Sequence, residues 1–170
     1  PPSITHWREF ELSRHPAMTA LAFRGASDHS LDDKSRLIVP KRFLERLPPV
    51  ETNFVLTASP DGCLLLLDQK SFAEISDKLG GDPLGADRRS RGLRRLILGH
   101  AEDVKPDKTG RILISKVLRN FMGLGEKQDV VVVGTGNAIE LWARSRWSQA
   151  LEDGASCSLS DGTSVESAVS

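Results

Sequence analysis

The sequence lacks most of the features that mark a membrane protein or a disulfide-stapled domain. Its two cysteines, Cys63 and Cys157, are far apart and have no further Cys beside them. This spacing argues against a disulfide framework or a Cys-based zinc site and favours a reducing, cytoplasmic setting. The longest apolar runs, Cys63–Leu67 and Val130–Val133, are too short to cross a bilayer. Residues 1–20 carry charges throughout and lack the apolar stretch of a secretory signal.

Residue sets that carry out catalysis are also missing. No nucleophile, base and orienting group occur together in a recognisable pattern, and neither a phosphate-binding loop nor a dinucleotide fingerprint is present. His100 follows Gly99 in an apolar stretch, where a histidine is more often a structural group than a ligand. The other histidines form no metal-binding spacing with it. We therefore expect no enzyme activity, no metal, no cofactor and no small-molecule substrate.

The net charge is zero, because 23 Lys and Arg balance 23 Asp and Glu. The charges are nevertheless segregated. Residues 88–119 hold ten Lys or Arg against three Asp or Glu, whereas four acids and no base follow Leu151. Since a local field can steer a polyanion whatever the total charge, the basic middle of the chain keeps nucleic acid among the expected partners.

An internal repeat organises the chain, because a shift of 75 residues superposes Phe23–Leu47 on Leu98–Met122. The identical pairs are Ala26 and Ala101, Asp28 and Asp103, Asp32 and Asp107, Arg36 and Arg111, and Lys41 and Lys116. The apolar triplets Leu37-Ile38-Val39 and Ile112-Leu113-Ile114 also match, and we interpret both as short buried strands. The repeat therefore pairs two Asp-x-x-x-Arg turns.

Each copy is predicted to run strand, turn, strand, short helix, strand, turn, strand, helix, which gives a mainly β fold with short helices (α+β). A unit this small exposes strand edges and one apolar face, so the other copy is its obvious partner in an intertwined, pseudo-two-fold β-barrel. The predicted segments are an irregular extension (1–21), the first repeat (22–80), a basic helical connector (81–97), the second repeat (98–153) and a disordered tail (154–170).

Three segments in order resemble the MraZ family of bacterial regulators of the division and cell-wall gene cluster. They are Phe23–Phe43, Arg94–Ser115 with its Leu-Gly-His-Ala sequence, and Ile139–Trp147 with Glu-Leu-Trp. The resemblance spans residues 22–153. It implies a duplicated fold of the AbrB/SpoVT swapped-hairpin type and a transcription factor that binds repeated elements in its own promoter. It also implies ring-shaped homo-oligomers and a location at the nucleoid.

The resemblance maps Asp32 and Arg36 onto the family's first motif, and Asp107 and Arg111 onto the second. The family favours Gly before the first Arg, where this chain has Ser35, whereas the second copy keeps Gly110. Because Ser lacks glycine's freedom at positive φ, the shape of the first turn is open to question.

The candidate DNA-binding residues are the basic side chains in and around the turns, and the candidate turn-stabilising residues are their Asp and Gly. The DNA-binding candidates are Arg24, Lys34, Arg36, Lys41, Arg42, Lys108 and Arg111, and the turn-stabilising candidates are Asp32, Asp107 and Gly110. Guanidinium groups fork onto guanine edges or phosphates. The first copy has more basic neighbours, so we expect it to be the principal DNA contact.

Two alternatives stay open. The Asp-x-x-x-Arg pairs also suit a salt bridge across a tight turn, and the arginines of the amphipathic helix predicted over 86–98 suit a solvated face or a subunit contact better than DNA. The rival function is an oligomeric protein-interaction scaffold without specific DNA binding, which net neutrality and the acidic tail support.

Overall fold

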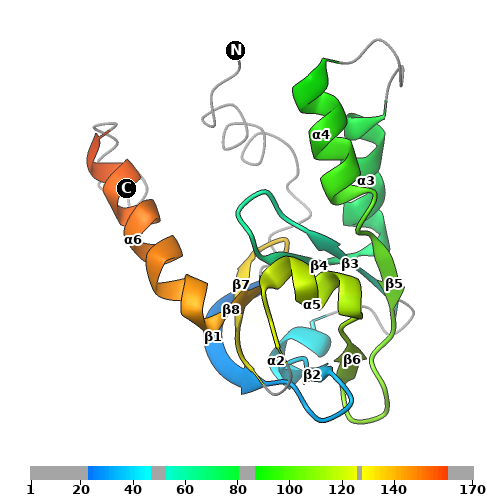
Figure 1. The fold of residues 1–170 in the computed structure, drawn as a ribbon. Coiled ribbons are helices and arrows are strands. Elements are labelled where there is room, and N and C mark those ends of the chain that lie inside the picture. The colour runs from blue at the N-terminus through cyan, green and yellow to red at the C-terminus, as the bar shows by residue number, and fades with distance from the viewer. Residues whose placement is uncertain (1–22, 47–52, 81–86, 126–127, 161–170) are drawn as a thin grey trace.

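The computed structural model describes residues 23–46, 53–80, 87–125 and 128–160 (Figure 1). It confirms the predicted α+β class, with mainly antiparallel strands and short helices. The first half contains β1 (Phe23–Ser30), β2 (Arg36–Ile38), α2 (Lys41–Leu44), β3 (Phe54–Ala58), β4 (Leu64–Asp68) and α3 (Gln69–Leu79). After α4 (Arg88–Ile97), the second half contains β5 (Glu102–Val104), β6 (Arg111–Leu113), α5 (Lys116–Met122), β7 (Asp129–Gly136), β8 (Ile139–Ala143) and α6 (Arg144–Ser160).

The two halves exchange strands within one six-stranded sheet of order β1-β7-β8-β4-β3-β5. Strand β1 of the first half pairs along its whole length with β7 of the second half. In the matching position, β5 of the second half pairs with β3 of the first. The hairpins β3–β4 and β7–β8 meet in the middle through β4 and β8. The intertwining expected from the repeat is therefore present in the strand order.

A second, two-stranded sheet consists of β2 and β6, one strand from each half, and is called the ribbon below. The strands run antiparallel, with Leu37 opposite Ile112 at the centre. The turns that precede the two strands lie side by side at the bottom of Figure 1, at the opposite end of the molecule from α3 and α4. Each ribbon strand has only three residues, so its stability depends on what it packs against.

The main core lies between the six-stranded sheet and the ribbon. Leu37 and Ile112 point inward from the ribbon and are both fully buried, as are Leu56 and Val132 from the large sheet. Phe43 of α2 joins this core and packs edge-on against Phe23 of β1, with ring centroids 5.6 Å apart. Burial of apolar surface is the dominant favourable term in folding, so these contacts hold the two sheets together.

Local signals in the sequence explain where several elements start and stop. The Ser115 hydroxyl accepts a hydrogen bond from the Leu118 amide at 3.3 Å and caps α5, as N-cap serines commonly do. Gly123 ends that helix with a φ of 72°, a left-handed conformation that glycine adopts freely. The β3–β4 hairpin turns through Ser59 and Gly62, whose amide donates to the Ser59 carbonyl at 3.0 Å.

The helices outside the two sheets differ in part from the sequence prediction. Helix α4 occupies residues 88–97 of the predicted connector, with Ile97 buried and Arg95 exposed. Helix α6 continues to Ser160, so residues 154–160 are helical and the predicted disordered tail is wrong for them. Within this part of the helix, the Ser156 hydroxyl donates to the Glu152 carbonyl at 2.8 Å. Residues 1–21, 81–86 and 161–170 of the predicted segments lie outside the described residues, as does residue 22.

Candidate functional site

The first Asp-x-x-x-Arg turn is closed by hydrogen bonds from both the backbone and the Asp32 carboxylate. The Asp32 amide donates to the Arg36 carbonyl at 3.0 Å, and the Ser35 amide donates to the Asp32 carbonyl at 2.9 Å. Oxygen Oδ1 of Asp32 accepts from the Lys34 and Arg36 amides, both at 2.9 Å. A short carboxylate that binds its own backbone in this way favours a tight turn over extended structure.

The second turn repeats this pattern 75 residues later. The Asp107 amide donates to the Arg111 carbonyl at 2.8 Å, and the Gly110 amide donates to the Asp107 carbonyl at 2.9 Å. Oxygen Oδ1 of Asp107 accepts from the Thr109 amide at 2.8 Å and the Arg111 amide at 3.0 Å. The Thr109 hydroxyl adds a further bond at 2.7 Å. The repeat seen in the sequence therefore extends to individual hydrogen bonds.

Ser35 adopts the conformation that the sequence analysis put in question. Its φ is 58°, in the left-handed region, and Gly110 at the matching position has a φ of 78°. The first turn therefore keeps the shape of the second although it lacks the glycine. A residue with a Cβ costs roughly 1–2 kcal/mol in this conformation, so Ser35 is a strained position.

The two turns are bound to each other as well as to their own strands. The Val39 amide, just after β2, donates to the Gly110 carbonyl at 2.9 Å. In the symmetric position, the Ile114 amide donates to the Ser35 carbonyl at 3.0 Å. The left-handed residue of each turn thus presents its carbonyl to the other half. A backbone hydrogen bond in each direction therefore joins the two turns.

Four charges alternate in sign where the turns meet. Nη2 of Arg36 lies 2.8 Å from Oδ2 of Asp32, and its Nε donates to the same oxygen at 2.8 Å. Nη1 of Arg36 also lies 3.6 Å from Asp107 of the other turn. In return, Arg111 lies 4.0 Å from Asp32. Arg36 is therefore held by contacts to both halves, whereas Arg111 makes a looser contact and is the more exposed, at 40% against 32%.

These contacts change the acidity of both aspartates. Hydrogen bonds from the Arg111 amide and the Thr109 hydroxyl lower the pKa of Asp107 from 3.8 to about 2. Hydrogen bonds from the backbone and side chain of Arg36 lower the pKa of Asp32. Both carboxylates are therefore ionised at neutral pH, as an ion-pair network needs.

The other predicted DNA-binding residues occupy two further regions. Lys34 and Lys108 are exposed at the tips of the turns, next to the arginines. On α2, Lys41 is 3.2 Å from Glu45, while Arg42 donates to the Ser27 hydroxyl at 3.0 Å and lies over the Phe43 ring. Arg24 is exposed near the start of β1, about 20 Å of strand away from the turn. The structure thus brings the turn residues together and leaves Arg24 apart from them.

Two residues of this surface were missed by the sequence analysis. The triplets that follow the turns were predicted to be buried strands, yet Ile38 is 42% exposed and Leu113 is 58% exposed. The prediction is wrong for these two because the ribbon has one face on the core, so that only alternate residues point inward. The sequence contained a signal for this exposure. Arg36 and Arg111 begin the two strands and should point outward, so the residues two positions further on, Ile38 and Leu113, should point outward as well.

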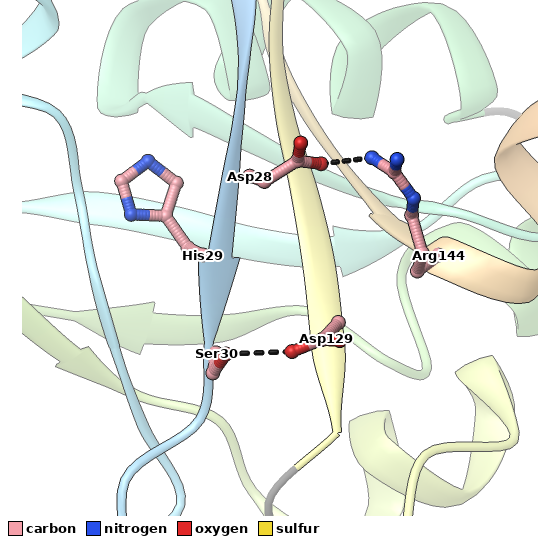
Figure 2. A pocket seen from close by; sticks show the side chains of 5 residues that line it. All are labelled: Asp28, His29, Ser30, Asp129 and Arg144. Carbon is pink, nitrogen blue, oxygen red and sulfur yellow. Dashed lines mark hydrogen bonds and ion pairs between the residues drawn. The ribbon is translucent and has the colours of Figure 1, made fainter.

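An open pocket of about 270 Å³ lies where β1, β7 and α6 meet, and Figure 2 shows its lining. Asp28 forms an ion pair with Arg144, and the Ser30 hydroxyl donates to Asp129 at 2.6 Å. His29 points to the other side of β1 (Figure 2), where its ring contacts the Ser27 hydroxyl at 3.0 Å. Both carboxylates already have partners, so the lining joins β1 to β7 and α6 rather than offering an empty site.

Other groups with possible chemistry have structural partners. His100 contacts the Leu96 carbonyl at 2.9 Å and packs against Phe121. Burial raises the pKa of the Cys63 thiol well above its ordinary value, which keeps it from acting as a thiolate nucleophile. Among the residues that the structure describes, no three His, Cys, Asp or Glu form a metal-holding group. The helices found there are likewise too short or too polar for a membrane span.

Comparison with known proteins gives a consistent result over both halves. A family model described as "MraZ protein, putative antitoxin-like" matches residues 22–94 and 97–166. A relative from Nitrosomonas europaea named transcriptional regulator MraZ is 42% identical over 126 residues, which cover 74% of this chain and 83% of the relative. Proteins of the same name from Methylobacillus flagellatus and Coxiella burnetii are 44% and 38% identical, covering 76% and 77% of this chain and 86% of each relative.

Replacing Ser35 by glycine is expected to stabilise the protein, because glycine removes the strain of a left-handed serine. We expect Ser35→Gly to raise the free energy of unfolding by about 1 kcal/mol, measured by urea denaturation. The matched change Gly110→Ser should lower it, because a Cβ there would lie 3.0 Å from Cδ1 of Leu44. A destabilised Ser35→Gly protein would contradict the strain at this turn.

The lowered pKa values of the two aspartates predict a specific loss of stability at low pH. Because the folded-state pKa of Asp107 is about 2 and its ordinary value is 3.8, the stabilisation is complete above pH 3.8. It is lost as the pH falls through 2. We expect Asp107→Asn to reduce the fall in the urea midpoint over this range. The control is Asp153→Asn on α6, which should follow the wild type. If the urea midpoint of Asp107→Asn falls as much as that of the wild type over this pH range, the charge does not stabilise the turn.

Proposed function

Because the chain belongs to the MraZ family, we propose that it is a DNA-binding transcriptional regulator whose paired turns contact the duplex. The name of its relatives, transcriptional regulator, supports the first part. The second part rests on one observation, the cross-pairing of β2 with β6, which gathers the basic residues of both motifs on the ribbon and its two turns. These residues are Lys34, Arg36, Lys108 and Arg111.

The ribbon has the shape and charge that DNA recognition needs. A two-stranded β-ribbon fits the major groove of B-DNA, where arginine reads guanine edges. Lys34 and Lys108 extend from the two turn tips and supply point charges for phosphates, which fix position without reading sequence. Lys41 and Arg42 on α2, with Arg24 on β1, would lie further out along the backbone of the same duplex.

The two copies take unequal parts in this proposal. Arg36 is held by Asp32 at 2.8 Å, so its guanidinium meets DNA in a fixed orientation, which favours the first copy as the principal contact. Arg111 is the more exposed of the two, and its guanidinium lies 4.0 Å from the Asp32 carboxylate, against 2.8 Å for that of Arg36. It therefore serves as an adjustable second contact. A preorganised donor loses less conformational entropy on binding than a mobile one.

Finer features of the family complete the proposal. We place the fold in the AbrB/SpoVT swapped-hairpin barrel class, supported by the exchange of β1 and β5 between the halves. The target is a set of repeats in the promoter of the chain's own operon, in the division and cell-wall cluster, and the protein works at the nucleoid. Several copies in a ring would bind several repeats, which raises the effective concentration of each contact.

The molecular mass of the protein in solution tests whether it forms a ring. We expect light scattering after size exclusion to give a multiple of the 18.6 kDa chain mass, with the exposed Val117 of α5 as a candidate for subunit contact. A monomer at micromolar concentration would contradict the ring. The rival scaffold function, in which basic helices and exposed strand edges bind protein partners, predicts a stable assembly that captures a protein and shows no preference for the promoter over random DNA.

Arg36→Ala is the variant that tests DNA contact by the turn. We expect it to keep its circular dichroism spectrum and lose at least tenfold in affinity for the upstream promoter fragment, measured by fluorescence anisotropy. A salt series should show affinity falling as salt rises, since phosphate contacts release counterions. Arg95→Ala changes an exposed arginine on α4, outside the ribbon and its turns; it is the charge-matched control and should bind normally. Unchanged affinity in Arg36→Ala would show that this arginine is only structural.

A further inference from the structure

The outward face of the ribbon carries two exposed apolar side chains between its two arginines. Leu37 and Ile112 are fully buried on the inner face, so the alternate residues of each strand point outward. Arg36 lies opposite Leu113, and Ile38 lies opposite Arg111. Charged and apolar side chains alternate among these four outward residues, which are called the outer ribbon face below. The repeat relates the two residues on one strand to the two on the other.

The exposed apolar residues have no role in the core that the structure describes. Leu37 and Ile112 already close the core beneath the ribbon, and Ile38 and Leu113 lie outside the clusters of buried residues. Polar residues at both positions would serve a ribbon that faces only water. Large apolar residues there indicate a surface that is covered when the protein works.

The pattern of the face selects the kind of molecule that covers it. Its apolar residues are diagonal to each other and each lies opposite an arginine, so they form no continuous apolar patch of the kind that fills the centre of a protein interface. The major groove of DNA presents the complementary pattern. Guanine offers two acceptors to an arginine, and thymine offers an apolar 5-methyl group a short distance away.

We propose that Ile38 and Leu113 each contact the 5-methyl group of a thymine, and so contribute base specificity beside the two arginines. The inference rests on the proposed DNA-binding function. Diagonal neighbours on a β-ribbon are about 7–8 Å apart, which is roughly two base-pair steps at about 3.4 Å each. Because the repeat relates the two residues by a pseudo-two-fold axis, the two thymines belong to opposite strands.

The test combines single substitutions in the protein with single substitutions in the DNA and compares the affinities. The probe is the duplex most enriched by the wild-type protein from a random pool, remade with each thymine replaced singly by deoxyuridine, which lacks only the methyl group. We expect two thymines on opposite strands at which the wild type loses about fourfold in affinity, the value for one buried methyl-sized group. Leu113→Ala should bind the parent duplex more weakly and be insensitive to deoxyuridine at one of these positions. Ile38→Ala should be insensitive at the other.

A matched control separates this result from a general loss of binding. Leu151→Ala removes another exposed leucine, 54% exposed on α6 and outside the ribbon, and should respond to deoxyuridine as the wild type does. If the wild type prefers the selected duplex but no deoxyuridine substitution matters, the thymine contacts are wrong while the DNA-binding function stands. The same holds if Leu113→Ala keeps the wild-type response, or if its main effect is a change in oligomeric mass. If the wild type enriches no duplex, the proposed function itself fails.

Discussion

The pairing of β2 with β6 is the constraint on which the rest of the molecule depends. Each strand has three residues, and each comes from a different half of the chain. The carbonyls of Ser35 and Gly110, at the left-handed position of each turn, accept amides from the opposite half. The shape of each turn, the closure of the core by Leu37 and the position of the charges are therefore set by one structural unit.

The same pairing decides what the Asp-x-x-x-Arg motif does. Each aspartate first closes its own turn through backbone amides and then faces an arginine, and Arg36 reaches both aspartates. The alternatives left open by the sequence, a structural salt bridge or a DNA contact, are thus compatible: the ion pair orients a guanidinium that remains about one-third exposed. A fixed, partly exposed arginine is better prepared for base recognition than a fully solvated one.

The sequence predicted the local structure well because local signals specify it. The aspartates that begin the two turns accept hydrogen bonds from amides two and four residues further along the chain. The repeat predicted the order of the elements, since two copies of one unit must fold alike. Ser35 illustrates this, because it adopts the same left-handed conformation as Gly110 although serine disfavours a positive φ.

The sequence could not predict features that depend on contacts between distant segments. The order of strands in the large sheet follows from which hairpin receives β1, and no single segment encodes that choice. The exposure of Ile38 and Leu113 is a different case, because the arginine that begins each strand indicated which residues point outward, but the apolar triplets were interpreted without it. Both apolar triplets were therefore given as buried, and the residues that we propose to read thymine were missed.

The central claim is that the two paired turns form one DNA-binding surface, and hydrogen exchange of the free and DNA-bound protein tests it most directly. With a selected duplex bound, mass spectrometry should show slower exchange at residues 32–39 and 107–114 together, and unchanged exchange in α4. Protection centred on α4, with both turns unaffected, would contradict the account.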